Sequence, residues 1–262
     1  MIIDTHTHIY PDKIAHKASR TVGEFYEMPM GYDGSAANLL ETGLAAGIDK
    51  FVVCSVATVP GQVRSVNRFI AEAVRQSGGR FRGYGTLHPS CENIPALAEE
   101  IISLGLCGVK LHGDFQKFMI DSPAAMKIYE CLEGRLPVLL HSGDYRTPYT
   151  KPARIANVAR AFPKLDIIAA HFGGWSEWGS SALELAELGV YIDTSSSMYA
   201  IKPRFAKLLI DTFGAERVFF GTDYPMWRAR KELEYISLLP LSDSEREGIL
   251  SGNYLRFISK YE

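Results

Sequence analysis

Eight short apolar runs recur along the chain, and a longer amphipathic stretch follows each of them. Each run is rich in Val, Ile, Leu and Phe and ends in polar or turn-forming residues, which is typical of strands buried on both faces of a parallel sheet. This pattern restricts the fold most strongly, because strands that alternate with helices form βα units. The runs cover residues 1–6, 49–56, 80–88, 105–113, 136–142, 165–172, 189–196 and 217–225.

The stretches between the runs have the apolar spacing of helices, and several begin at Ser, Asp or Pro and end at Gly. Eight such repeats predict a closed parallel (βα)8 barrel rather than an open doubly wound sheet, and no GxGxxG motif follows the first run. No linker interrupts the chain, so we expect a single barrel domain over 1–262, with one or two extra helices in the tail 242–259. The helical stretches cover residues 35–48, 62–79, 94–105, 122–134, 151–163, 181–189, 203–214 and 229–239.

Charge and cysteine content exclude several classes of protein. The formal net charge is -2 and no basic run is present, so no footprint for nucleic acid or an anionic membrane stands out. The first residues lack the charged and apolar segments of a secretory signal, and the apolar runs are too short to span a bilayer. We therefore expect a cytoplasmic protein with reduced thiols that acts on a small molecule. The cysteines are Cys54, Cys91, Cys107 and Cys131.

Most histidines fall where the apolar runs end. The carboxyl ends of the strands form the functional face of a (βα)8 barrel, so these side chains are expected to meet on one rim. Only His16 falls clearly elsewhere. The residues expected at the rim are His6, His8, His88, His112, His141 and His171, together with Asp193 and Asp223.

His6 and His8 have the spacing of a metal site, because residues at i and i+2 of a strand point to the same face. Two neutral imidazoles on one face can bind the same Zn, Mn, Fe or Ni ion. His141 and Asp223 can reach the same point from across the barrel, which gives the open ligand set of a catalytic site. The competing interpretation is that His6 and His8 are half-buried and bond to backbone carbonyls.

Four segments, DTHTH (4–8), LLHSG (139–143), AHFGG (170–174) and GTDYP (221–225), resemble the amidohydrolase superfamily of metal-dependent barrels. The closer resemblance is to the subgroup related to aminocarboxymuconate-semialdehyde decarboxylase. It implies one divalent ion, with Zn²⁺ preferred over Mn²⁺ and Fe²⁺, and the ligands His6, His8, His141 and Asp223. It also implies that His171 polarises the substrate or moves a proton, and that Asp223 takes the proton from metal-bound water in hydrolytic relatives.

Lys110 and His112 share one face of the fourth run. A lysine inside a barrel is unfavourable unless it is paired or modified. We expect a charged, catalytic Lys110 close to a carboxylate of the substrate. The alternatives are a carboxylated Lys110 that bridges a second metal ion, as in binuclear members of the superfamily, and a salt bridge with Asp4 or another buried acid.

Other residues near the rim are candidates for contacts outside the metal site. Asp193 is placed either to orient one of the site imidazoles or to hold Ser195 or Ser196 in a loop. The apolar segment 22–34 shows no regular periodicity, and we expect it to be a loop that forms a wall of the substrate site or an oligomer contact. The candidates for substrate binding are His112, Asp144, Arg146 and Trp175.

The activity expected from these features is that of a metal-dependent hydrolase, which cleaves an amide, ester or lactone of a small molecule with metal-activated water. A nonoxidative decarboxylase of an aromatic or enolic acid is the alternative, ranked second because the chain is short for such enzymes. The absence of an acidic residue in the fourth run argues against a two-metal phosphoesterase, and the intact ligand positions argue against a non-catalytic scaffold. Analogy with relatives indicates a homodimer.

Overall fold

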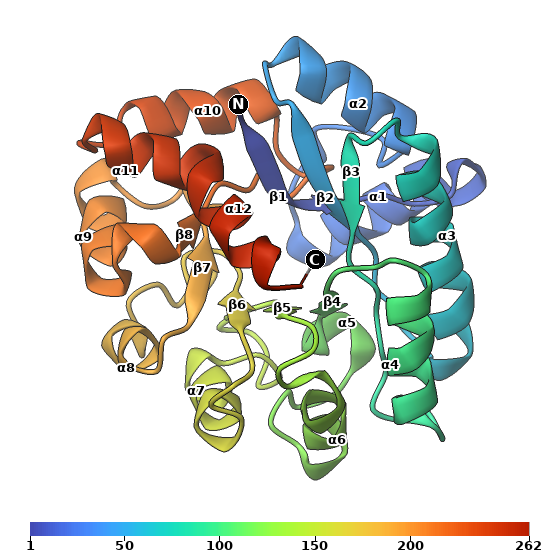
Figure 1. Ribbon diagram of the computed structural model, residues 1–262. Coiled ribbons are helices and arrows are strands. Elements are labelled where there is room, and N and C mark those ends of the chain that lie inside the picture. Colours follow the sequence, from blue (N-terminus) through green and yellow to red (C-terminus); the bar gives the residue numbers. More distant parts are fainter. Residues whose placement is uncertain (262) are drawn as a thin grey trace.

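The computed structural model describes residues 1–261, and this part of the chain forms eight parallel strands inside a ring of helices (Figure 1). Each strand overlaps one of the eight apolar runs, so the predicted (βα)8 barrel is confirmed. The strands are β1 (Ile3–His8), β2 (Lys50–Cys54), β3 (Phe81–Gly83), β4 (Val109–Leu111), β5 (Val138–Leu140), β6 (Ile167–Ala169), β7 (Tyr191–Asp193) and β8 (Val218–Phe219).

Neighbouring strands pair in chain order, and single bridges close the barrel. β1, β2 and β3 form one parallel sheet, and β4 to β8 form the other. Gly85 pairs with Val109 between the two sheets, and Thr7 pairs with Tyr224 where the end of the last unit meets the first strand. This closure places β1 directly beside the segment that follows β8.

Each predicted helical stretch contains a helix on the outside of the barrel (Figure 1). Ser35 caps the first of these by accepting a hydrogen bond from Asn38 N at 3.2 Å. None of the described helices has the length and apolar character needed to cross a membrane. The helices are α2 (Ala36–Ala45), α3 (Val63–Gln76), α4 (Ile94–Ser103), α6 (Pro123–Leu132), α7 (Pro152–Ala161), α8 (Ala182–Glu187), α9 (Pro203–Phe213) and α10 (Ala229–Ser237), with the short α5 (Gly113–Gln116) after β4.

The C-terminal tail forms α11 (Asp243–Glu247) and α12 (Asn253–Ile258), as predicted. α12 lies across the amino-terminal end of the barrel, close to the start of β1 (Figure 1). Tyr254 and Phe257 pack against Phe219 of β8, with ring centroids 5.7 and 5.2 Å apart. Because this apolar cluster covers the amino-terminal end, the functional residues are left to the carboxyl end.

The sequence predicted a loop from residue 22 onward, whereas in the structure helix α1 (Asp12–Tyr26) continues as far as Tyr26. The helix ends at Glu27, whose φ of 55° is left-handed, and the chain is irregular from there to Ser35. Gly23 allows the chain to turn back closely, because a Cβ there would lie 2.7 Å from Met28 O. The segment 22–34 joins the last turn of this helix to the irregular stretch that follows it, so no single periodicity runs through the segment.

Candidate metal centre and active-site cavity

Two histidines of β1 and an aspartate after β8 bring their ligand atoms together at the carboxyl end of the barrel. His6 Nε2 lies 3.2 Å from His8 Nε2. Asp223 Oδ1 lies 3.6 Å from His6 Nε2 and 3.4 Å from His8 Nε2. Ligands that bind one ion at about 2.1 Å with tetrahedral geometry are separated by about 3.4 Å. The spacing of these three atoms therefore fits one divalent metal ion.

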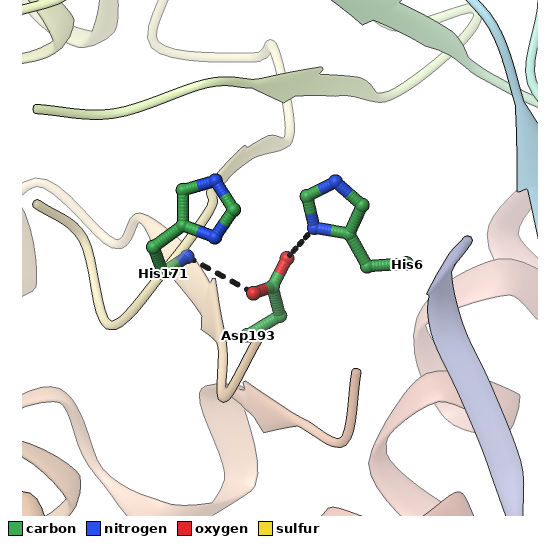
Figure 2. Close-up of side chains that lie close together, drawn as sticks. All are labelled: His6, His171 and Asp193. Carbon is green, nitrogen blue, oxygen red and sulfur yellow. Dashed lines mark hydrogen bonds and ion pairs between the residues drawn. The ribbon is translucent and has the colours of Figure 1, made fainter. Parts of the chain in front are cut away.

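Asp193 at the end of β7 orients His6 and His171 (Figure 2). Its Oδ2 lies 2.8 Å from His6 Nδ1, and its Oδ1 accepts a hydrogen bond from His171 N at 3.0 Å. Burial alone would raise the pKa of Asp193, but the contacts with His6 and His171 hold that pKa below its usual range. The carboxylate favours a proton on His6 Nδ1, which leaves the lone pair of Nε2 for a metal ion.

The second carboxylate oxygen of Asp223 is also occupied. Ser196 Oγ donates a hydrogen bond to Asp223 Oδ2, and Trp227 Nε1 donates to Ser196 Oγ at 2.7 Å. Asp223 and Ser196 have left-handed φ values of 59° and 47°, a strained backbone that tends to occur at functional sites. Asp223 therefore has a fixed orientation, with one oxygen toward the histidines of β1 and the other toward Ser196.

His141 and His171 meet on the neighbouring part of the rim. His141 Nδ1 lies 3.0 Å from His171 Nε2, and His171 Nδ1 lies 2.8 Å from Ser195 Oγ. The His171 ring stacks on the His6 ring with centroids 5.2 Å apart. Burial lowers the pKa of His171 to about 4, so the ring is neutral near pH 7. The structure thus brings His6 and His8 together with Asp223, and it places His141 beside His171.

Asp114, which was not a candidate from the sequence, lies beside both His112 and His141. Its Oδ2 is 3.7 Å from His112 Nδ1 and 3.7 Å from His141 Nε2. These two buried nitrogens have no hydrogen-bond partner among the described residues. The two rings are stacked with centroids 3.8 Å apart and an interplanar angle of 8°. Because a metal ion binds in the plane of an imidazole ring, two parallel rings stacked in this way do not share an ion, and both nitrogens face Asp114 beyond hydrogen-bond distance.

Lys110 on β4 is fully buried, and its Nζ lies 3.0 Å from His6 Nε2. Burial lowers the pKa of this ammonium group. Asp4, the alternative partner considered from the sequence, accepts hydrogen bonds from Thr222 N and Thr222 Oγ1 at 3.0 and 2.6 Å. The ammonium group and a metal ion would therefore compete for the same lone pair on His6.

This competition gives a testable prediction for metal binding. We expect Lys110→Met to bind a divalent ion at least about tenfold more tightly than the wild type, because a competing and repelling positive charge is removed. Titration calorimetry with Mn²⁺ and with Zn²⁺ measures the effect. The matched control is Lys127→Met on the exposed face of α6, whose affinity should not change. Equal or weaker metal binding by Lys110→Met would contradict the prediction.

We call His6, His8 and Asp223 the metal group. A cavity of about 490 Å³ lies between α1 and the segments that follow the strands, and it opens onto this group. His112 and Trp175 line this cavity, together with His8, Lys110, His141, His171 and Asp223. Asp144 and Arg146 are not part of its lining. Arg146 Nε and Nη2 donate to the two carboxylate oxygens of Asp144 at 2.9 and 2.8 Å, and Nη1 donates to Phe25 O at 3.0 Å. We therefore assign this pair to holding the end of α1 against the barrel.

A closed (βα)8 barrel with two inward-facing histidines on its first strand and an aspartate beside them after its last strand has the architecture of metal-dependent barrel proteins. The chain belongs to the amidohydrolase family, whose model matches residues 3–258. The resemblance inferred from the four short segments is thereby confirmed for nearly the whole chain.

One curated relative is the 2-amino-3-carboxymuconate-6-semialdehyde decarboxylase of Dictyostelium discoideum. It is 25% identical over 234 residues, which cover 74% of this chain and 65% of the relative. The match thus spans slightly less than two thirds of the relative's length, so the relative's activity is carried to this chain only as a proposal.

Several solved structures share the fold over nearly their whole length. An uncharacterised TIM-barrel protein from Bordetella bronchiseptica has a TM-score of 0.79 and 20% identity, with 99% of each chain covered. The 5-carboxyvanillate decarboxylase of Sphingomonas paucimobilis has a TM-score of 0.72 and 18% identity, with 98% of each chain covered. A dihydroxybenzoic acid decarboxylase from Polaromonas sp. JS666 with bound manganese and the inhibitor 2-nitroresorcinol has a TM-score of 0.73 and 17% identity, with 100% of this chain and 97% of that chain covered.

These relatives correct the expected activity. Those that carry a named activity are decarboxylases, so the expectation of a hydrolase is wrong. The metal-binding residues did not separate the two reactions, because a bound divalent ion can assist either one. Chain length was a poor guide as well, since this chain covers 98% and 97% of the two solved decarboxylases.

Proposed function

We propose that this protein is a metal-dependent, nonoxidative decarboxylase of a small aromatic or enolic carboxylic acid. The cavity carries this proposal, because it combines groups suited to a carboxylate with aromatic walls suited to a planar acid. The metal group and Lys110 lie at one side, and Tyr26, Phe115 and Trp175 form the aromatic part of the lining. The activity of the curated relative supports the proposal.

The metal ligands in this proposal are His6, His8 and Asp223, with His141 as the fourth ligand inferred from the sequence. When bound, the ion supplies positive charge that stabilises negative charge developing on the substrate. Imidazole and carboxylate ligands suit Zn²⁺, Mn²⁺ and Fe²⁺. The sequence favoured Zn²⁺, whereas the manganese of the Polaromonas enzyme favours Mn²⁺, and metal analysis of the purified protein distinguishes them.

Decarboxylation breaks the bond between the carboxylate carbon and the ring or enol carbon. Carbon dioxide leaves, the electron pair stays on the ring or enol carbon, and one proton must be added there. We assign the movement of this proton to His171, whose side chain lines the cavity and whose Nδ1 contacts Ser195 Oγ. The ammonium group of Lys110 offsets the negative charge of the substrate carboxylate.

The reaction is tested by following the release of labelled carbon dioxide from a panel of carboxyl-labelled acids incubated with the metal-loaded protein. The panel starts with 2,6-dihydroxybenzoate and 5-carboxyvanillate, which the solved relatives name, and includes enolic acids. Esters and lactones of similar size are assayed in parallel for hydrolysis. Cleavage of these esters or lactones without carbon dioxide release from any acid would overturn the proposal.

A substitution at His171 tests its assigned role. We expect His171→Asn to lower carbon dioxide release by about 100- to 10,000-fold, the range for loss of a general acid or base. The metal content of the purified variant should stay close to that of the wild type. The matched control is His16→Asn on the exposed face of α1, which should keep wild-type activity. Activity within a few fold of wild type in His171→Asn would remove His171 from the proton transfer.

A further inference from the structure

Tyr26, the last residue of α1, is held firmly in the cavity wall. Its ring packs edge-on against Trp175 and Phe115, with centroids 5.0 and 5.9 Å apart. The guanidinium carbon of Arg146 lies 5.5 Å from the centre of the same ring. Tyr26 and its neighbour His112 both line the cavity. The phenol therefore presents its oxygen at a defined place on the wall.

A chain of polar groups runs from Tyr26 through His112 to Asp114. Tyr26 Oη lies 3.0 Å from His112 Nε2, and His112 Nδ1 faces Asp114 Oδ2 at 3.7 Å without a hydrogen-bond partner among the described residues. Thr147 Oγ1 donates to Asp114 Oδ1, and Thr150 Oγ1 lies 2.6 Å from Asp114 Oδ2 and 2.7 Å from Gly143 O, so its single proton serves two acceptors. Burial raises the pKa of Asp114, but its Oδ2, which faces a hydroxyl and two imidazole nitrogens, is placed to accept.

This arrangement favours one direction for the hydrogen bond between Tyr26 and His112. Because Asp114 is an acceptor, the proton of a neutral His112 is favoured on Nδ1, where it faces Asp114. His112 Nε2 then accepts, and Tyr26 donates its one hydroxyl proton to it. The phenolic oxygen keeps a free lone pair, so Tyr26 can accept a further hydrogen bond from a group in the cavity.

We propose that Tyr26 determines substrate specificity by accepting a hydrogen bond from a hydroxyl or amino group of the acid. The inference rests on the proposed function in that the ligand is a carboxylic acid bound at the metal group. The preferred acid carries a hydrogen-bond donor on the side that meets Tyr26. An acid whose donor is methylated leaves the phenolic oxygen unpaired and is discriminated against.

The test measures the Kd of benzoate, of the three monohydroxybenzoates and of their methyl ethers for the metal-loaded protein. For any acid that the protein turns over, KM is measured in place of Kd. At least one hydroxy isomer should bind about tenfold more tightly than its methyl ether, as expected for one hydrogen bond. Tyr26→Phe keeps the ring and loses only the oxygen, and it should bring this ratio to about one. The matched control Tyr145→Phe, at a tyrosine that is 70% exposed, should keep the ratio.

Three results would overturn the inference: no hydroxy isomer preferred by the wild type, no binding of any of these acids, or a preference that persists in Tyr26→Phe. The comparison of hydroxy acids with their methyl ethers uses the wild type alone, so it holds even where the variant folds poorly. An absence of carbon dioxide release with the binding ratios intact would overturn the proposed function and leave the role of Tyr26 supported.

Discussion

Asp223→Asn is expected to lose at least about 100-fold in affinity for a divalent ion and to show no measurable turnover. Loss of an outer partner of a metal ligand typically lowers affinity by about 10- to 100-fold, and loss of a charged ligand should exceed that. Asp223 Oδ1 lies within 3.6 Å of the Nε2 atoms of both His6 and His8, and an amide in its place has no negative charge. Titration calorimetry and metal analysis of the purified variant measure the loss.

The fold of Asp223→Asn should remain that of the wild type, because the amide has nearly the same shape and keeps an oxygen for Ser196. Circular dichroism and thermal unfolding check this point. Asp211→Asn, at a residue of α9 that pairs with Lys207, is the matched control and should bind metal normally. Unchanged metal affinity in Asp223→Asn would exclude this carboxylate from the metal site.

Asp193→Asn is expected to lower both the stability of the fold and the affinity for metal. The buried carboxylate contacts His6 Nδ1 and accepts hydrogen bonds from the backbone N–H groups of His171 and Ser195. Removing the charge from such a buried pair lowers the free energy of unfolding by about 3 kcal/mol. Because His6 loses the acceptor that fixes its tautomer, metal affinity should fall by about 10- to 100-fold. Chemical denaturation of the metal-free proteins and metal titration measure the two effects separately.

The stability difference between wild type and Asp193→Asn should depend on pH in a defined direction. The pKa of Asp193 is held below its usual range in the folded state, so its charge stabilises the fold fully above the unfolded pKa of about 4. The difference should be constant between about pH 6 and pH 8 and should shrink as the pH falls below about 4. A difference that grew on acidification would contradict the assigned ionisation of Asp193.

The strands and most helices were predictable because their signals are local. An apolar run that ends in polar residues indicates a buried strand wherever it lies in the fold, and the spacing of His6 and His8 places both on one face. The position of Asp193 at the end of its run left two roles open, an imidazole partner or a contact with a nearby serine, and the structure shows Asp193 in contact with both His6 and Ser195. The last turn of helix α1 was missed, because the segment 22–34 continues beyond Tyr26 into an irregular stretch and therefore has no single periodicity.

The remaining parts of the site depend on contacts between distant segments. Asp114 was overlooked because nothing in the sequence shows that the chain after β4 brings this carboxylate beside both His112 and His141. Arg146 was a candidate for substrate binding, yet its guanidinium group bonds to Asp144 and to Phe25 O. Tyr26, which was not a candidate, lines the cavity. The ligand positions also do not distinguish hydrolysis from decarboxylation, because a bound divalent ion can assist either reaction.

The sequence by itself determined the barrel and the kind of metal-binding side chains it carries, since periodicity and residue type are written along the chain. Only the tertiary structure decided how these side chains face one another. Closure of the barrel brings His6 beside Asp223, more than 200 positions away, and it directs Lys110 Nζ to the same imidazole nitrogen that a metal ion would use. The hydrogen bond to Asp193 and the nearby carboxylate of Asp114 then favour one protonated nitrogen on each of His6 and His112, and this choice depends on the positions of the two aspartates in space.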